Sequence, residues 1–407
     1  MRSLDVYWDQ ERVGRLSEQA ERRWSFRYDA DYKGLSISAS LPKAQEEASG
    51  LVVFAYFTNL LPEAAIRTQI ARHLGQSAED DFGLLEALGG EIAGALTLLP
   101  AGEVPPAPSE QVYRQLTQAE LLRFVREPTE AISRWAEGSV RLSLAGAQSK
   151  LPVVAEDGKL WLPESTEPTT HLLKFASPSF KRLPENEAFC LRLARNAGLE
   201  VVSAELVADG QAVLIERFDR MTDADGWVHR LHQEDACQAL GLPSTRKYQE
   251  EGGPGLEDLF GLIDRIVQTP ALDRQKALRL LAFNLAIGNA DAHGKNFSFL
   301  RDSEGVRLAP GYDLVSTAHY KGIDRRLAMR LAEVSDPDRI KKDTWLAVAR
   351  ELGFQPRYLA QELTNTLEMV ESALKRTLEE MPVKSQDICR VLGREVRKRI
   401  GLRIKAL

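Results

Sequence analysis

The pattern of hydrophobic and polar residues changes along this chain from the period of a strand to the period of a helix. Apolar and polar residues alternate near the N-terminus, over residues 4–8, 13–16, 24–28 and 35–38. A period of two turns one face of a strand toward a core, so this part predicts a small antiparallel sheet or partial barrel. From residue 256 onward, apolar residues recur every three or four positions, which predicts helices apart from one hairpin.

Between these two parts, the predicted helices and strands are mixed. One helix is marked by Pro62 in its first turn and by Gly75 after its last turn. Further helices are predicted at residues 53–61, 84–88, 118 to about 135, 185–194 and 231–241. Strands are predicted at residues 95–99, 140–154 around a loop of small residues, 170–175, 201–207 and 212–215.

The most informative polar motif lies in residues 287–297, between a predicted helix and the predicted hairpin. Asp291 is followed five residues later by Asn296, and the second strand of the hairpin leads to Asp313. Because a hairpin brings its two ends together, we expect Asn296 and Asp313 to meet at one edge. Phosphoryl transfer requires a carboxylate that accepts the proton of the attacking hydroxyl, and an Asn and an Asp that hold Mg²⁺ against nucleotide phosphates. Single Asn and Asp residues also cap turns, but this role does not explain the whole motif.

Two motifs in the middle of the chain can bind phosphate. Lys174 lies within an apolar strand, where a buried ammonium group needs an anionic partner, and Glu187 of the next helix could orient it as in protein kinases. A lysine that reaches solvent from an edge strand is the alternative. The small residues of 145–150 allow backbone N–H groups to approach an anion, although a plain hairpin is the simpler explanation of this motif alone.

The segment Glu216–Arg220 leaves a predicted buried strand. Its backbone groups could pair with the edge of an adenine while Phe218 packs nearby. An ordinary turn, in which Glu216 and Asp219 offset two arginines, is the alternative. Together, a strand-rich part, a helical part and phosphate chemistry where they join predict an α+β fold, namely a bilobal protein-kinase-like fold with an N-terminal β-rich subdomain and a mostly helical C-terminal lobe.

Composition narrows the possible partners and location. The 407 residues carry a formal net charge of −6, which argues against a chain that coats nucleic acid by itself. The exception is the basic segment 384–407, which could touch DNA phosphates, although a solvated helical face explains it as well. Cys190, Cys237 and Cys389 lie far apart, which indicates buried thiols in a reducing compartment and no zinc site. No signal core or long apolar run is present, so we expect a cytoplasmic protein with no membrane partner.

Eight motifs follow one another along the chain: Ser-x-Ala-Gly-Ala-Gln-x-Lys, Thr-His-x-x-Lys, Asn-Glu-x-x-Cys-Leu, Glu-Arg-Phe-Asp-Arg, Gln-Glu-Asp-x-Cys-Gln, Lys-Tyr…Gly-Gly-Pro-Gly, Asp-x-His-x-Lys-Asn-Phe-Ser and Tyr-Asp. In this order they resemble the HipA family, which comprises serine/threonine kinase toxins of bacterial type II toxin–antitoxin modules. The resemblance covers essentially the whole chain. It implies an N-terminal subdomain over residues 1–137, the nucleotide-binding part of a kinase core over 138–255 and a helical catalytic lobe over 256–407.

The resemblance also implies roles for the matching residues. Asp291 would accept the proton, Asn296 and Asp313 would bind Mg²⁺, Lys174 would bind the ATP phosphates, and Ser143 would be an autophosphorylation site whose modification silences the kinase. The further nucleotide-binding residues that it implies are Ala145, Gly146, Ala147, Gln148, Ser149, Lys150, Glu216, Arg217, Phe218, His293, Lys295 and Tyr312.

The partners that the resemblance implies are a helix-turn-helix antitoxin similar to HipB, operator DNA bound through that antitoxin, and an aminoacyl-tRNA synthetase, classically the glutamyl enzyme, as the protein substrate. Phosphorylation of the synthetase on a serine would stop translation and growth. Two other functions remain open from the sequence. One is a small-molecule phosphotransferase with the same catalytic loop, and the other is a non-catalytic subunit of a DNA complex.

Overall fold

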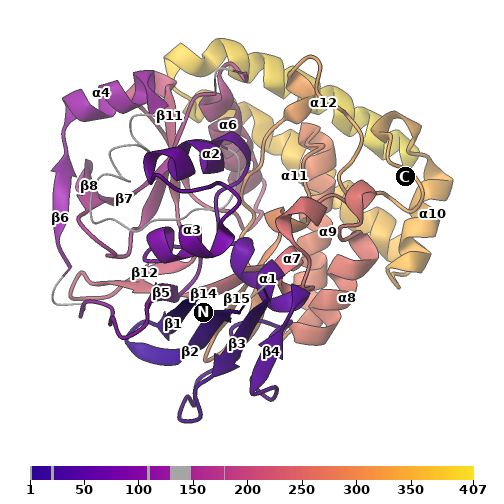
Figure 1. The fold of residues 1–407 in the computed structure, drawn as a ribbon. Helices are drawn as coiled ribbons and strands as arrows, with labels where there is room; N and C mark the ends of the chain where they lie inside the picture. Colours follow the sequence, from indigo (N-terminus) through magenta and orange to yellow (C-terminus); the bar gives the residue numbers. More distant parts are fainter. Residues whose placement is uncertain (1, 20–22, 108–110, 129–147, 178) are drawn as a thin grey trace. The chain divides into compact units, whose positions relative to one another are not determined.

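The structure is a computed structural model that describes residues 2–19, 23–107, 111–128, 148–177 and 179–407 (Figure 1). The chain forms two compact units, and each unit combines segments that are distant in sequence. Unit 1 consists of Met1–Phe175, Ile215–Ser244 and Leu300–Glu304. Unit 2 consists of Ala176–Leu214, Thr245–Phe299 and Gly305–Leu407.

Unit 1 begins with an antiparallel sheet of order β4-β3-β2-β1-β5. Its strands are β1 (Arg2–Trp8), β2 (Glu11–Glu18), β3 (Trp24–Tyr28), β4 (Glu47–Ser49) and β5 (Leu96–Pro100). The alternation therefore predicted the first three strands and the strand near 95–99 correctly. Residues 35–38, which also alternate, form no strand. The phenolic O–H of Tyr56 donates to the carbonyl oxygen of Ile37 (3.1 Å), so side-chain contacts hold this segment instead of a ladder.

Three helices cover this sheet, as the indigo and purple segments of Figure 1 show. They are α1 (Leu51–Thr58), α2 (Ala64–His73) and α3 (Asp81–Leu88). One continuous apolar core joins sheet and helices, and Leu4, Phe26 and Phe57 are fully buried in it. The predicted helices of this part are confirmed, with boundaries shifted by two or three residues.

A second sheet of unit 1 places the strands β9, β7, β8 and β6 side by side in that order. Strand β11 (Ala212–Glu216), whose last two residues belong to unit 1, lies on the other side of β9. The other strands are β6 (Tyr113–Leu116), β7 (Lys150–Glu156), β8 (Lys159–Pro163) and β9 (His171–Phe175). The helix α4 (Gln118–Arg126) follows β6 in the chain. The predicted helix from 118 to about 135 and the first part of the predicted strand pair at 140–154 extend into residues 129–147, which lie outside the described residues.

One helix prediction in unit 1 is wrong over its first half. The strands β12 (Arg220–Thr222) and β13 (Val228–Arg230) form a ribbon, and β14 (His232–Asp235) follows before the short helix α7 (Ala236–Ala239). The carboxylate of Glu234 does not serve a helix dipole, because it accepts hydrogen bonds from Ser38 (2.5 Å) and Arg301 (2.7 Å). Tertiary contacts thus override the local helix signal.

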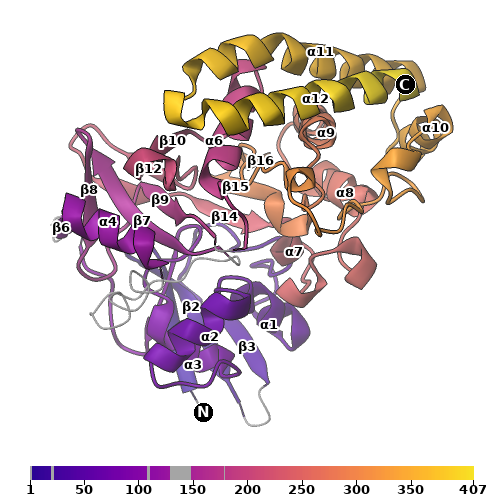
Figure 2. The same cartoon turned by 90° about the horizontal axis from the view of Figure 1, so that it is seen from above.

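Unit 2 is mostly helical. Its helices are α6 (Leu183–Asn196), α8 (Leu256–Ile266), α9 (Pro270–Ile287), α10 (Lys342–Glu351), α11 (Pro356–Glu380) and α12 (Gln386–Ala406). Helix α11 packs against α6, α9 and α12, and Figure 2 shows α11 and α12 lying side by side. The strand β10 (Ala204–Val207) follows α6, and the hairpin β15 (Ser298–Asp302) and β16 (Gly305–Leu308) follows α9. No helix among the described residues is both long and apolar enough to cross a bilayer.

A buried ion cluster ties together distant segments of unit 1. Both oxygens of Glu91 are engaged, since they lie 2.7, 2.9 and 3.0 Å from the guanidinium groups of Arg217, Arg220 and Arg230. Asp219 pairs with Arg217 and Arg220 as well. Burial alone raises the pKa of Glu91, but the three arginines outweigh this effect and hold the pKa below its usual value.

This cluster generates a prediction about stability. Replacing Glu91→Gln should lower the free energy of unfolding by about 3–5 kcal/mol, because it removes the carboxylate that three guanidinium groups share and leaves only Asp219 to pair with Arg217 and Arg220. Urea unfolding at pH 7 measures the change. The control is Glu47→Gln, which breaks an exposed pair with Arg27 and should leave stability nearly unchanged. Equal stability of the two variants would show that the cluster does not hold unit 1 together.

Candidate active site

The candidate catalytic segment begins where α9 ends, in unit 2. Gly288 adopts φ 70°, in the left-handed region that ends helices, and it turns the chain out of α9. The amide nitrogen of Asn289 donates to the side-chain oxygen of Asn284 (2.9 Å), and the amide oxygen of Asn289 accepts from the backbone N–H of Asp291 (3.0 Å). The backbone of Asp291 therefore leaves the helix in a fixed direction.

Thr317 holds the same turn from the other side. Its hydroxyl accepts from the backbone N–H of Ala290 (2.8 Å) and donates to the carbonyl oxygen of Gly288 (3.1 Å). The backbone N–H of Ala318 also donates to Gly288 (3.0 Å). The segment after Asp313 thus acts as a clamp on the turn that carries Asp291.

The side chain of Asp291 is held by a tyrosine. The hydroxyl of Tyr248 donates to Oδ1 of Asp291 at 2.6 Å, and the Tyr248 ring meets the His293 ring edge-on, with centroids 5.1 Å apart. The carbonyl oxygen of Lys247 accepts from the backbone N–H of Gly294 (3.2 Å), so the loop that carries Tyr248 is attached to the catalytic segment. One carboxylate oxygen is thereby fixed, which is suited to a group that accepts a proton through the other.

Sequence reasoning missed Tyr248. Glycine and glutamate are frequent in the surrounding residues 247–255, and the contact with Asp291 spans 43 residues of sequence. The signal available was an aromatic side chain inside an otherwise polar, glycine-rich segment.

Asn296 and Asp313 are brought to the same region by the bonds of their neighbours. The side-chain nitrogen of Asn296 donates to the carbonyl oxygen of Asp291 (2.8 Å), which directs the amide oxygen elsewhere. The hydroxyl of Tyr312 donates to the carbonyl oxygen of Lys295 (2.5 Å) and lies 2.7 Å from Oγ of Ser298. Tyr312 precedes Asp313 and Lys295 precedes Asn296, so the hairpin returns the chain beside Lys295, whereas the meeting of Asn296 and Asp313 themselves stays a prediction.

The chemistry of these two side chains suits a hard cation. An amide oxygen and a carboxylate are ligands that Mg²⁺ prefers. Asp313 has φ 56°, an unusual backbone conformation that aspartate tolerates and that often occurs at functional sites. Among the described residues, no group of three or more His, Cys, Asp or Glu is arranged to hold a metal ion. The three cysteines are buried, as predicted for Cys190 and Cys237.

The other candidate residues of this segment are largely enclosed. His293 and Lys295 are buried, whereas Asp291, Asn296 and Asp313 are only partly buried. On α6, Asn186 exchanges two hydrogen bonds with the backbone of Ser316 (2.9 and 3.1 Å) and fixes the chain that follows Asp313. Glu187, the next residue, is fully buried.

The candidate phosphate-binding lysines lie in unit 1. Lys174 is buried in β9, and its cross-strand partner in β7 is Lys150. Directly opposite residues of an antiparallel pair point to the same face, and two positive charges so placed favour an anion beside them. The side chain of Gln148 donates to the carbonyl oxygen of Phe175 (2.8 Å), and the carbonyl oxygen of Ser149 accepts from the N–H of Phe175 (3.1 Å). Because Lys174 and Glu187 belong to different units, their pairing stays a prediction.

The candidate adenine-binding residues have different environments. Glu216 is exposed and Phe218 is half-buried. Arg217 is buried in the ion cluster, and its backbone N–H donates to the carbonyl oxygen of Thr170 (2.9 Å), so its polar groups are engaged within unit 1. The turn contains ion pairs, as the alternative of an ordinary turn predicted. However, the acid that pairs with its arginines together with Asp219 is Glu91 and not Glu216. Ser143, Ala145, Gly146 and Ala147 lie outside the described residues.

Comparison with known proteins identifies relatives over nearly the whole chain. Residues 4–99 match the model of the HipA N-terminal domain, and residues 142–375 match that of the HipA-like C-terminal domain. Y4mE of Sinorhizobium fredii is 43% identical over 391 residues, which are 93% of each chain. The serine/threonine-protein kinase toxin HipA of Shewanella oneidensis is 30% identical over 402 residues, covering 95% of this chain and 91% of that protein.

A solved structure agrees with these matches. It contains HipA and HipB of Shewanella oneidensis with their operator DNA, and the matched chain has a TM-score of 0.87 at 28% identity, covering 99% of both chains. The fold and its relatives define a serine/threonine kinase with a mixed α and β, kinase-like fold. The chain belongs to the HipA family of toxin kinases. The predictions of fold class, family and kinase activity are confirmed.

The clamp on the catalytic turn generates a prediction about local dynamics. Thr317→Val removes the hydroxyl that bridges Ala290 and Gly288, and a partly buried N–H left without its acceptor costs about 1–2 kcal/mol. Amide hydrogen exchange over residues 288–291 should therefore become roughly tenfold faster or more. Thr317→Ser keeps the hydroxyl and is the control. Unchanged exchange in Thr317→Val would show that the clamp is not needed to order the turn.

Proposed function

We propose that this kinase transfers the γ-phosphate of ATP to a serine hydroxyl of a protein, with Asp291 as the proton acceptor. The observation that carries the proposal is the hydrogen bond from Tyr248 to Oδ1 of Asp291, in a segment where the side chain of Asn296, five residues further on, is bonded to the Asp291 carbonyl. A carboxylate with one oxygen fixed presents the other to the substrate hydroxyl, as a general base requires.

Two residues that follow Asp291 in the chain would bind a metal ion. Asn296 and Asp313 would hold Mg²⁺, which when bound neutralises charge on the nucleotide phosphates. Asn296 contributes its amide oxygen, because its nitrogen is committed to the Asp291 carbonyl. Tyr312 positions Asp313 through its bonds to Lys295 and Ser298.

The nucleotide would be bound by residues from several segments of the chain. In unit 1, Lys174 and its cross-strand neighbour Lys150 supply positive charge, and the backbone from Ala145 to Ser149, including Gln148, supplies N–H groups for the phosphates. Glu216 and Phe218 would face the adenine, whereas Arg217 would contribute only by stabilising that turn. In unit 2, His293, Lys295 and Tyr312 would line the catalytic end of the nucleotide.

The biological role would be that of a toxin held by an antitoxin. The solved structure of HipA with HipB and operator DNA supports a HipB-like helix-turn-helix partner and co-repression on DNA. The protein substrate would be an aminoacyl-tRNA synthetase whose modification stops translation. Autophosphorylation of Ser143 would silence the kinase, since about two negative charges beside a phosphate-binding loop repel ATP.

The role of Asp291 can be tested with an almost isosteric change. Asp291→Asn should keep the fold and ATP binding but reduce phosphate transfer by roughly 100-fold or more, because the amide cannot accept the proton. The measurements are radiolabel transfer to protein, with ATP affinity by calorimetry as the folding control. Label on Ser143 would support a protein kinase over a small-molecule phosphotransferase. Full activity of Asp291→Asn would refute the assignment.

Tyr248 provides a second test of the same geometry. Tyr248→Phe removes one hydrogen bond to a carboxylate, worth about 1.5–3 kcal/mol, so kcat should fall by roughly tenfold or more while KM for ATP stays the same. Tyr358→Phe alters a half-exposed ring on α11 and is the matched control. A rise in KM for ATP with kcat unchanged would show that Tyr248 serves nucleotide binding and does not position Asp291.

A further inference from the structure

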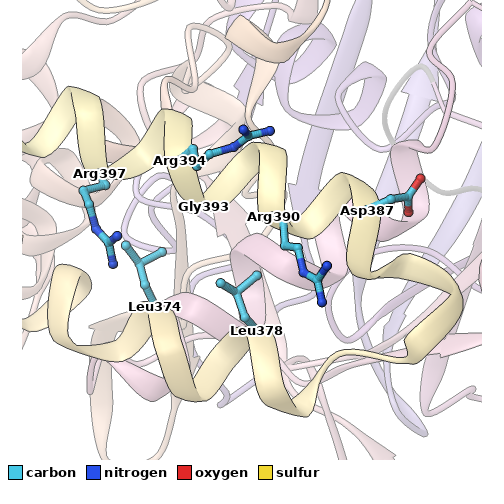
Figure 3. Close-up of a pocket in the computed structure, with 7 residues that line it drawn as sticks. All are labelled: Leu374, Leu378, Asp387, Arg390, Gly393, Arg394 and Arg397. Atoms are coloured by element: carbon cyan, nitrogen blue, oxygen red, sulfur yellow. The ribbon is translucent and has the colours of Figure 1, made fainter.

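A groove of about 410 Å³ opens between the two long helices α11 and α12 of unit 2 (Figure 3). It lies outside the catalytic segment, and no step of the proposed reaction uses it. Leu374 and Leu378 of α11 point toward α12, and the side chains of Arg390 and Arg397 flank them. The groove therefore combines an apolar floor with cationic walls.

The floor is open because α12 has a glycine there. A Cβ atom at Gly393 would lie 3.6 Å from Cδ1 of Leu378 and 3.8 Å from Cδ2 of Leu374, which is ordinary van der Waals contact. Any larger side chain at this position would fill the space above the two leucines. The groove thus depends on the absence of a side chain at residue 393, in the middle of a helix where glycine is intrinsically unfavourable.

The walls carry a net positive charge. Arg390, Arg394 and Arg397 are exposed and follow one another at intervals of four and three residues, so they line one side of α12. The lining carboxylate, Asp387, is neutralised by two hydrogen bonds from Arg182 (2.8 and 3.0 Å). Arg397 has a loose surface pair with Glu371 at 3.5 Å.

Arg390 and Arg394 carry the remaining guanidinium groups of the groove. Within the part of the chain that the structure describes, no ion pair engages Arg390 or Arg394. Like charges spaced by four residues on a helix repel each other, which an anionic ligand would relieve. This positive surface belongs to a protein whose formal net charge is −6, so it stands out against the rest of the chain.

We propose that this groove binds an acidic segment of a partner protein, one that places an apolar side chain between carboxylates. The apolar side chain would cover the partly exposed Leu378 beside the buried Leu374 and Gly393, and the carboxylates would pair with Arg390 and Arg394. A nucleic acid would match the charge but would leave the leucine floor uncovered. The lining also lacks an aromatic side chain on which a base could stack.

The test uses the full-length protein and a fluorescein-labelled synthetic helical peptide in which one leucine is flanked by glutamates four residues before and three residues after it. Fluorescence anisotropy should show saturable binding. The double variant Arg390→Glu/Arg394→Glu and the variant Gly393→Leu should each weaken the affinity at least tenfold. Arg339→Glu, at an exposed position outside the groove, should bind like the unmodified protein.

Several outcomes would overturn the proposal. A peptide with serine in place of leucine that binds equally well would show attraction by charge alone, and a 20-base-pair DNA duplex that binds in preference to the peptide would show a nucleic-acid surface. Because Gly393→Leu could impair folding, Gly393→Ala is tested beside it, with thermal unfolding of all variants. A folded Gly393→Ala protein should lose part of the affinity, and full affinity in it would refute the role of the floor.

Discussion

The turn at the end of α9 is the constraint on which the candidate active site depends. Gly288 takes a left-handed conformation that ends the helix, and side chains from three segments then fix the few residues that follow. Asn289 holds the N–H of Asp291, Thr317 holds that of Ala290, and Tyr248 holds the carboxylate itself. A catalytic carboxylate must point in one direction to be useful. Here that direction is set by side-chain hydrogen bonds to the backbone of the turn and by the Tyr248 hydroxyl on the carboxylate itself.

The sequence contained enough local information to predict the groups of this candidate site, but not the groups that support them. The spacing of Asp291, Asn296 and the hairpin allows that prediction because these residues are close along the chain and their chemistry is specific. Tyr248 and Thr317 act across long separations, and nothing in a tyrosine or a threonine alone indicates a partner. The same limit explains the errors in the fold. The 35–38 segment alternates like a strand and 231–235 resembles the start of a helix, yet contacts with distant residues such as Tyr56 and Arg301 decide their conformation.

Positive charge is used in two different ways in unit 1. Arg217, Arg220 and Arg230 surround Glu91, and Asp219 pairs with the first two, so most of their charge is balanced inside the protein. Lys150 and Lys174 instead face each other across two strands, where their charges add. The first arrangement stabilises the fold, and the second concentrates positive charge on one face of the sheet. Arginine suits the first because its planar group serves several acceptors at once, and lysine suits the second because it presents a compact charge to a phosphate.

The position of Glu91 has a consequence for how such proteins can evolve. This residue lies in the part of the chain that matches the HipA N-terminal domain, whereas its arginine partners lie in the part that matches the C-terminal domain. If recombination replaced one of these parts by the corresponding part of a distant relative, either Glu91 or its arginine partners would be left without the opposite charge. The two regions are therefore expected to be inherited together, as one evolutionary module in spite of their separate family models.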